Sequence, residues 1–212
     1  MVAYNYIKLG KKLFPLNRSI TGSDLRKTLL ILKKHLRNLK ILHIRSGKKV
    51  FDWKIPEEWN VRSAYIKDNK GKKLIDFKKN NLHLVSYSIP IKKKIQLNKL
   101  KKNLHFLKKQ KNAIPYVTSY YKKYWGFCIS YNQLFSIEKK YSSKARFEIA
   151  INSNFKKTGK LSYGELLIKG KSKKEILIST NICHPSMANN ELSGPTVATA
   201  LVKHFEKKKN YL

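Results

Sequence analysis

The chain has 212 residues, of which 42% are apolar, and it carries a formal net charge of +35. This length suits one or two domains with a real hydrophobic core, and the absence of a run of about 18 apolar residues excludes a membrane-spanning helix. Six of the 47 basic residues are Arg, and the rest are Lys spread over every segment, which favours a solvated surface over a dedicated nucleic-acid site.

Residues 1–47 predict the N-terminal helical part of an α/β domain. The expected elements are helices at residues 1–16 and 25–36 and a strand at residues 39–47. Ser23 can act as the N-cap of the second helix. In the turn-rich link before it, we interpret Arg18 as a residue that stabilises a turn, with an approach to a substrate carboxylate as the alternative.

Residues 48–155 predict a separate, mostly β domain. The expected elements are strands at 49–53, 61–67, 73–77, 82–88, 116–121, 125–130 and 145–152 and helices at 94–107 and 130–139. Residues 68–71 are typical of a hairpin turn. We expect Trp59 and the other aromatic side chains of this domain to form its core rather than a binding platform.

Residues 156–212 predict strands, then a polar loop, then a helix. The expected elements are strands at 160–168 and 175–180 and a helix from about residue 194. Ser193 suits the N-cap of this helix, and Pro195 suits its first turn. The loop is then held at the carboxyl end of a strand and beside a helix N-terminus, where α/β proteins commonly bind ligands.

The polar loop carries the candidate metal ligands His184, Asn190 and Glu191. A neutral imidazole and a carboxylate both suit Zn²⁺. Spacing alone leaves a structural hydrogen-bonded pair of His184 and Glu191 as the alternative. It also leaves open whether Cys183 is a third ligand or, as we favour, a small buried hydrophobe.

Several motifs carry a resemblance to a known family. They are Ile-Cys-His-Pro-Ser-Met-Ala-Asn-Asn-Glu-Leu-Ser-Gly-Pro at residues 182–195 and shorter matches at residues 13–22, 51–53, 58–60, 114–121, 125–128 and 162–166. With these motifs the chain resembles a bacterial family of aminopeptidase-like proteins of uncharacterised function, related to zinc exopeptidases of the glutamate carboxypeptidase type. The resemblance implies a zinc-exopeptidase-like α/β domain interrupted by a mostly β inserted domain, with a metal site at the strand ends.

The resemblance also implies roles for the loop residues. His184 matches the first zinc ligand of the related enzymes, and Asn190 falls where they carry a metal-bridging Asp. A neutral amide is a weaker ligand than a carboxylate, so we do not expect a bridged two-metal centre. Glu191 could supply the carboxylate of a one-metal site, or it could contact a metal ligand without contacting the metal. The related enzymes carry their general base and remaining ligands further downstream than Leu212, so we expect an incomplete, inactive N-terminal half, whether a fragment, a split gene or a prematurely ended frame.

Three functions are compatible with these patterns. The first is an aminopeptidase-like, zinc-dependent hydrolase of peptide or amide bonds, with a small peptide-like substrate. The alternatives are a basic protein that binds nucleic acid or another anionic surface, and a non-catalytic scaffold of peptidase shape. We expect only non-specific contact with nucleic acid and no membrane partner. Because Cys128 and Cys183 do not form a disulfide framework, a cytoplasmic location is expected.

Overall fold

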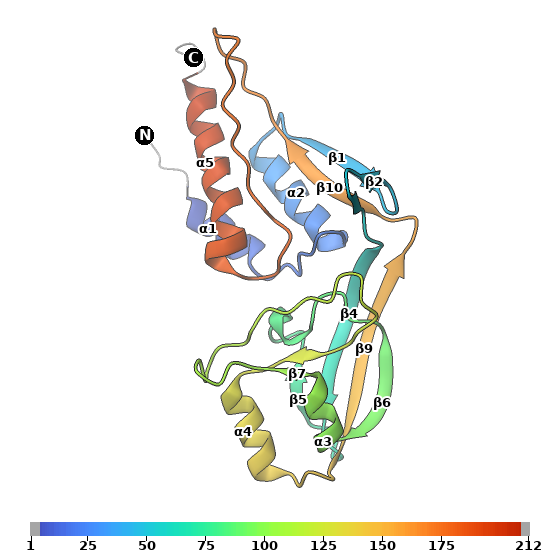
Figure 1. Ribbon diagram of the computed structural model, residues 1–212. Coiled ribbons are helices and arrows are strands. Elements are labelled where there is room, and N and C mark those ends of the chain that lie inside the picture. The colour runs from blue at the N-terminus through green and yellow to red at the C-terminus, as the bar shows by residue number, and fades with distance from the viewer. Residues whose placement is uncertain (1–4, 209–212) are drawn as a thin grey trace. The chain divides into compact units, whose positions relative to one another are not determined.

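The computed structural model describes residues 5–208, which form a mixed α/β architecture with several small sheets (Figure 1). Contacts between the described residues divide them into unit 1, residues 5–58 and 157–208, and unit 2, residues 59–156. Residues 48–58, assigned to the inserted domain from the sequence, lie in unit 1. Within residues 5–208, no helix is both long and apolar enough to cross a membrane.

Unit 1 is built from three helices, two small antiparallel sheets and a π-helical turn. Its elements are α1 (Tyr6–Leu13), α2 (Ser23–His35), β1 (Lys40–Arg45), β2 (Lys49–Val50), β3 (Trp53–Lys54), β10 (Lys160–Glu165), η3 (Ala188–Leu192) and α5 (Ser193–Lys207). β1 pairs with β10, and β2 pairs with β3. The strand predicted over residues 49–53 is therefore a short hairpin, in which Phe51 adopts a left-handed φ of 53°. α1 packs against α5 and η3.

Of the described helices of unit 1, α1 begins with a side-chain cap, whereas α2 and α5 begin without one. The Oδ1 atom of Asn5 accepts a hydrogen bond from the N–H of Lys8 at 2.8 Å and caps α1. The prediction of Ser23 as the cap of α2 is wrong, because Gly22 occupies that position with a φ of 129°. Leucines from both helices form one buried cluster with Leu39 and Leu192. Its other members are Leu9, Leu13, Leu32 and Leu36.

The strand predicted at residues 175–180 does not form. No strand of the described chain pairs with this segment, and Ile176 and Leu177 are 93% and 90% exposed. A single extended segment leaves its backbone groups without a ladder, so β-propensity alone cannot make a strand. The strand predicted at residues 160–168 is shorter than expected and ends at Glu165. The polar loop therefore follows an extended segment and not a strand end.

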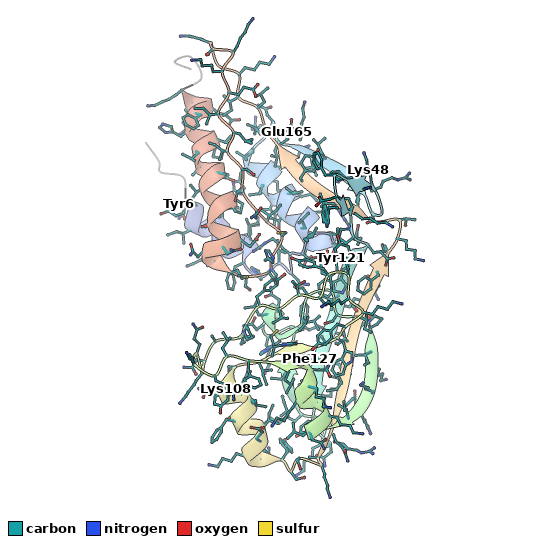
Figure 2. All side chains as sticks on the ribbon, in the orientation of Figure 1. Tyr6, Lys48, Lys108, Tyr121, Phe127 and Glu165 are labelled. Atoms are coloured by element: carbon teal, nitrogen blue, oxygen red, sulfur yellow. The ribbon has the colours of Figure 1, made fainter. Side chains whose placement is uncertain are left out.

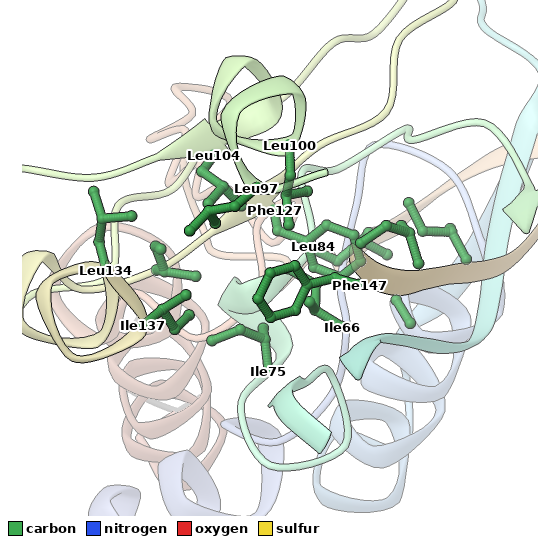
Figure 3. Packing of buried hydrophobic residues seen from close by; sticks show 14 of the residues in the cluster. Ile66, Ile75, Leu84, Leu97, Leu100, Leu104, Phe127, Leu134, Ile137 and Phe147 are labelled. Atoms are coloured by element: carbon green, nitrogen blue, oxygen red, sulfur yellow. The ribbon is translucent and has the colours of Figure 1, made fainter. Parts of the chain in front are cut away.

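Unit 2 is organised around a four-stranded sheet in the order β5-β4-β9-β6. The elements are β4 (Glu58–Lys67, which begins at the boundary), β5 (Lys73–Asp76), η1 (Asn81–His83), β6 (Ile91–Gln96), α3 (Leu97–Leu100), η2 (Lys101–Asn103), β7 (Leu104–His105), β8 (Phe127–Cys128), α4 (Tyr131–Lys140) and β9 (Arg146–Lys156). Figure 3 shows Phe147 of β9 packed among apolar side chains from the neighbouring elements. Trp59 is 2% exposed and belongs to the same core, as predicted.

Two predictions for unit 2 are confirmed, the turn at residues 68–71 and the helix at residues 130–139. Asp68 accepts hydrogen bonds from the N–H groups of Lys70 and Lys72, at 3.0 and 2.8 Å, and closes the turn between β4 and β5. Ser130 and Gln133 form a reciprocal capping box at the start of α4.

The prediction of a helix over residues 94–107 is wrong. This stretch begins in β6, where Ile95 lies opposite Phe147 of β9, and continues through two short helical turns into β7. The strand predicted at residues 82–88 is replaced by η1 and isolated bridges, and the strand predicted at residues 116–121 contributes only a bridge between Thr118 and Ser86. β8 lies within the strand predicted at residues 125–130 and pairs in parallel with β7.

His83 is expected to make unit 2 less stable in acid. Its ring is 5% exposed, and Nδ1 lies 2.8 Å from the carbonyl oxygen of Cys128, to which the neutral ring can donate. Burial lowers the pKa of His83 below its ordinary value. The unfolded chain therefore takes up a proton that the folded chain resists. We expect the free energy of unfolding to be highest above about pH 6.5 and to fall as the pH decreases from there through the folded-state pKa.

Urea unfolding at several pH values between 5 and 8 checks this expectation. A His83→Gln variant is the comparison, because glutamine does not titrate. It should show a weaker loss of stability on acidification, whatever its stability at neutral pH. Identical pH slopes for the two proteins would show that His83 is not the responsible group.

Candidate metal centre

Three side chains with metal-ligand chemistry meet at the end of the polar loop. They are Cys183, His184 and Glu191, and their potential ligand atoms all lie within 4.8 Å of one another. Cys183 and His184 are half-buried, whereas Glu191 is 1% exposed. We call these three residues the metal cluster.

The backbone between the loop and α5 folds Glu191 back over its partners. Ser186 and Met187 both adopt left-handed conformations, with φ values of 51° and 43°, which turn the chain sharply into η3. The N–H of Glu191 donates to the carbonyl oxygen of Met187 at 2.9 Å and closes that turn. Gly194 then permits a close approach, since a Cβ atom at this position would lie 1.8 Å from Oγ1 of Thr180.

Glu191 organises the loop with both of its carboxylate oxygens. Oε2 accepts hydrogen bonds from the backbone N–H of Cys183 at 2.6 Å and from that of His184 at 3.3 Å. Oε1 contacts Nδ1 of His184 and lies 3.6 Å from Sγ of Cys183. A buried carboxylate is stable only when it is paired and hydrogen-bonded, and this one meets both conditions.

Charges within the cluster stabilise one another. The contacts of His184 with Cys183 and then Glu191 raise the pKa of His184 to about 9. Burial favours the neutral form of Glu191, but its hydrogen bonds with His184 and with the N–H of Cys183 outweigh burial and lower its pKa. Both shifts favour the charged forms, so they favour an ion pair between His184 and Glu191 when no metal is bound.

The structure brings together two of the three residues predicted as metal ligands. His184 and Glu191 are in contact, whereas Asn190 lies on the same π-helical turn with an exposed side chain. The sequence favoured a buried, inert Cys183, but its Sγ lies 3.5 Å from Nδ1 of His184. Its position directly before His184 was the signal that could have placed it in the site.

This arrangement differs from a nucleophilic triad. In such a triad the nucleophile and the orienting carboxylate approach different nitrogens of the His ring. Here Cys183 and Glu191 both approach Nδ1. The cluster does match a set of zinc ligands, because thiolate, imidazole and carboxylate all bind Zn²⁺, and three protein ligands leave a fourth position for substrate or water. Ligand atoms of tetrahedral zinc lie roughly 3.3–3.8 Å apart, so the residues present fit the ion with small side-chain movements.

Comparisons with known proteins identify a family of unknown function and two relatives with peptidase-like names. A family described as a domain of unknown function, DUF4910, matches residues 6–212. A protein of Clostridium acetobutylicum, provisionally named as a polysaccharide biosynthesis protein with an aminopeptidase-like domain, is 45% identical over 206 residues, which are 97% of this chain and 45% of that protein. A crystal structure from the same organism, provisionally titled a peptidase, is 44% identical with a TM-score of 0.89 and covers 95% of this chain and 46% of its own. The chain thus spans about half the length of these relatives.

Proposed function

The chain belongs to the DUF4910 family, and from this premise we propose that it is an aminopeptidase-like, metal-dependent hydrolase of peptide or amide bonds. The observation that carries the proposal is the convergence of Cys183, His184 and Glu191 on one point. The name of the Clostridium relative, which contains an aminopeptidase-like domain, supports the reaction class. A small peptide-like substrate and a cytoplasmic location are part of the same proposal.

The proposal assigns a role to each residue of the cluster. Cys183 and His184 would hold the metal, for which we propose zinc, and Glu191 would hold it directly or orient His184 from behind. Asn190, exposed on the same turn, would offer its amide oxygen as a weaker ligand. A zinc ion bound there would polarise a substrate carbonyl and lower the pKa of a bound water.

Proton transfer needs a further residue. Both oxygens of Glu191 are already committed to the loop, so Glu191 is a poor candidate for a general base that must exchange a proton with water. We propose that the base comes from outside the metal cluster. The metal cluster alone is then expected to bind zinc without supplying the proton transfer.

Zinc stoichiometry and affinity test the proposal. We expect one Zn²⁺ per chain, and we expect His184→Ala to weaken zinc binding at least tenfold because an imidazole ligand is lost. His204→Ala is the matched control, since His204 is an exposed histidine of α5 in the same unit. Absence of zinc binding by the wild-type chain, or equal affinities for the three proteins, would overturn the proposal.

The high positive charge predicts a separate and non-specific behaviour. Lysines such as Lys48 and Lys108 extend from exposed positions in both units (Figure 2). With a net charge of +35, the chain should bind DNA weakly by releasing counterions. We expect its affinity for a DNA duplex to fall by about a hundredfold or more between 50 and 200 mM salt. Binding that is insensitive to salt would instead favour a dedicated nucleic-acid function.

A further inference from the structure

Arg18 connects two parts of unit 1 that are far apart in the sequence. It lies in the link between α1 and α2, and its side chain is 1% exposed. Nη1 donates a hydrogen bond to the carbonyl oxygen of Leu13 at 2.5 Å, and Nη2 donates to the carbonyl oxygen of Ser186 at 3.2 Å. One guanidinium therefore joins the C-terminal end of α1 to the loop that carries the metal cluster.

Burial of Arg18 is costly, so its position needs an explanation. A buried guanidinium loses its hydration, and its Nε has no hydrogen-bond partner. Glu191 is the negative charge that most strongly stabilises its protonated form against burial. The interpretation of Arg18 as a contact for a substrate carboxylate does not fit, because the head group is buried and both Nη atoms donate to backbone carbonyls.

The backbone that Arg18 contacts is strained. Ser186 and Met187 are consecutive non-glycine residues in the left-handed region, a conformation that persists only where the surroundings enforce it. The hydrogen bond from Arg18 reaches the carbonyl oxygen of the first of these two residues. From the C-terminal side, Glu191 holds Cys183 and His184. The turn is thus fixed at both ends by two oppositely charged, buried side chains.

We propose that Arg18 is a positioning residue that holds the turn at residues 186–187 and thereby keeps Cys183 and His184 in place against Glu191. This inference rests on the proposed function only where it concerns metal affinity. Its structural part, the holding of the loop, applies equally to the metal-free chain.

Zinc affinity distinguishes positioning from simple electrostatics. Arg18→Met removes the charge and both hydrogen bonds, whereas Arg18→Lys keeps the charge but cannot reproduce the planar fork that reaches two carbonyls. A positioning role predicts at least tenfold weaker zinc binding in both variants. A purely electrostatic role predicts tighter binding in Arg18→Met, because a repelling cation is lost, and no change in Arg18→Lys; that pattern would overturn the inference.

Arg26 provides the matched control. Its guanidinium also makes two hydrogen bonds in unit 1, to the two carboxylate oxygens of Glu58 at 2.8 and 2.7 Å. Arg26→Lys and Arg26→Met should leave zinc affinity within twofold of the wild-type value, even where they lower stability. An equal loss of zinc affinity in the Arg26 and Arg18 variants would mean that Arg18 acts only through general stability.

Thiol reactivity of the metal-free chain gives a readout that does not depend on zinc. Cys183 is half-buried in the held loop. We expect its alkylation by iodoacetamide, followed by mass spectrometry, to be at least fivefold faster in Arg18→Lys than in Arg26→Lys. Equal rates would overturn the inference. If the wild-type chain binds no zinc, the proposed function fails while this measurement still decides the role of Arg18. If Arg18→Met does not fold, Arg18→Lys decides both measurements.

Discussion

Replacing Phe147 with alanine is expected to lower the free energy of unfolding of the chain by about 3–5 kcal/mol. Phe147 is 1% exposed in β9, and its ring meets the ring of Tyr141 edge-on with centroids 5.2 Å apart. The variant loses the burial of a large apolar side chain, leaves a cavity and removes an aromatic pair. Figure 3 shows the ring surrounded by core side chains from several elements, so no single neighbour can close the gap.

Urea unfolding monitored by far-UV circular dichroism measures this loss. Phe135→Ala is the matched control, because Phe135 is 58% exposed on α4 of the same unit, and we expect its effect to stay within about 0.5 kcal/mol. Phe147→Leu keeps most of the volume and should cost about 1 kcal/mol. Similar costs for Phe147→Ala and Phe135→Ala would show that Phe147 does not occupy the core as described.

Local signals in the sequence predicted the elements that depend on local chemistry. The capping box of Ser130 and Gln133 and the turn at Asp68 involve residues no more than four positions apart, so their hydrogen bonds can be anticipated from spacing. α1 and β1 lie within their predicted ranges, although residues 1–4 of the first predicted helix lie outside the described chain, and β9 begins where predicted but continues to Lys156. In these cases the hydrophobic period and the termination signals agree.

The failures share a different cause. Leu97, Leu100 and Leu104 recur at helical spacing and favoured one long helix, yet Leu97 and Leu100 are buried from the single turn of α3 and Leu104 is buried from β7. Pairing of β6 with β9 decides the start of this stretch, and β9 begins about 50 residues later in the chain. At residues 175–180 a strand was predicted, but no partner strand is present among the described residues. The composition favours a strand, but a strand also needs a neighbour to pair with.

Only those residues of the candidate metal site that share one loop could be predicted from the sequence. The sequence placed His184 and Glu191 together because they are seven residues apart on a loop beside a helix N-terminus. The role of Arg18 could not be inferred in this way, because Arg18 and Ser186 are separated by 168 positions. Their contact is a property of the fold, and a single sequence contains no pattern that reveals it.

Replacing Glu191 with alanine is expected to have the second large effect, on stability and on zinc binding together. Removal of one partner of a buried ion pair costs about 3–5 kcal/mol, because the remaining charge is left without compensation. Here His184 loses its hydrogen-bond partner, the buried Arg18 loses a stabilising negative charge, and the N–H groups of Cys183 and His184 lose their acceptor. Zinc affinity should fall by at least tenfold, whether Glu191 binds the ion or orients His184 behind it.

Two further variants separate the contributions of Glu191. Glu191→Gln keeps the shape and one acceptor oxygen, so it should recover part of the stability but little of the zinc affinity, since an amide is a weaker ligand and a weaker partner for His184. Glu175→Gln, at an exposed carboxylate of the same unit, should change neither quantity. In the double variant Glu191→Ala with His184→Ala, we expect a smaller loss of stability than the sum of the two single losses, because each single variant already removes the interaction between the two side chains. Additive losses would mean that the two side chains do not form the coupled, buried pair on which the metal centre depends.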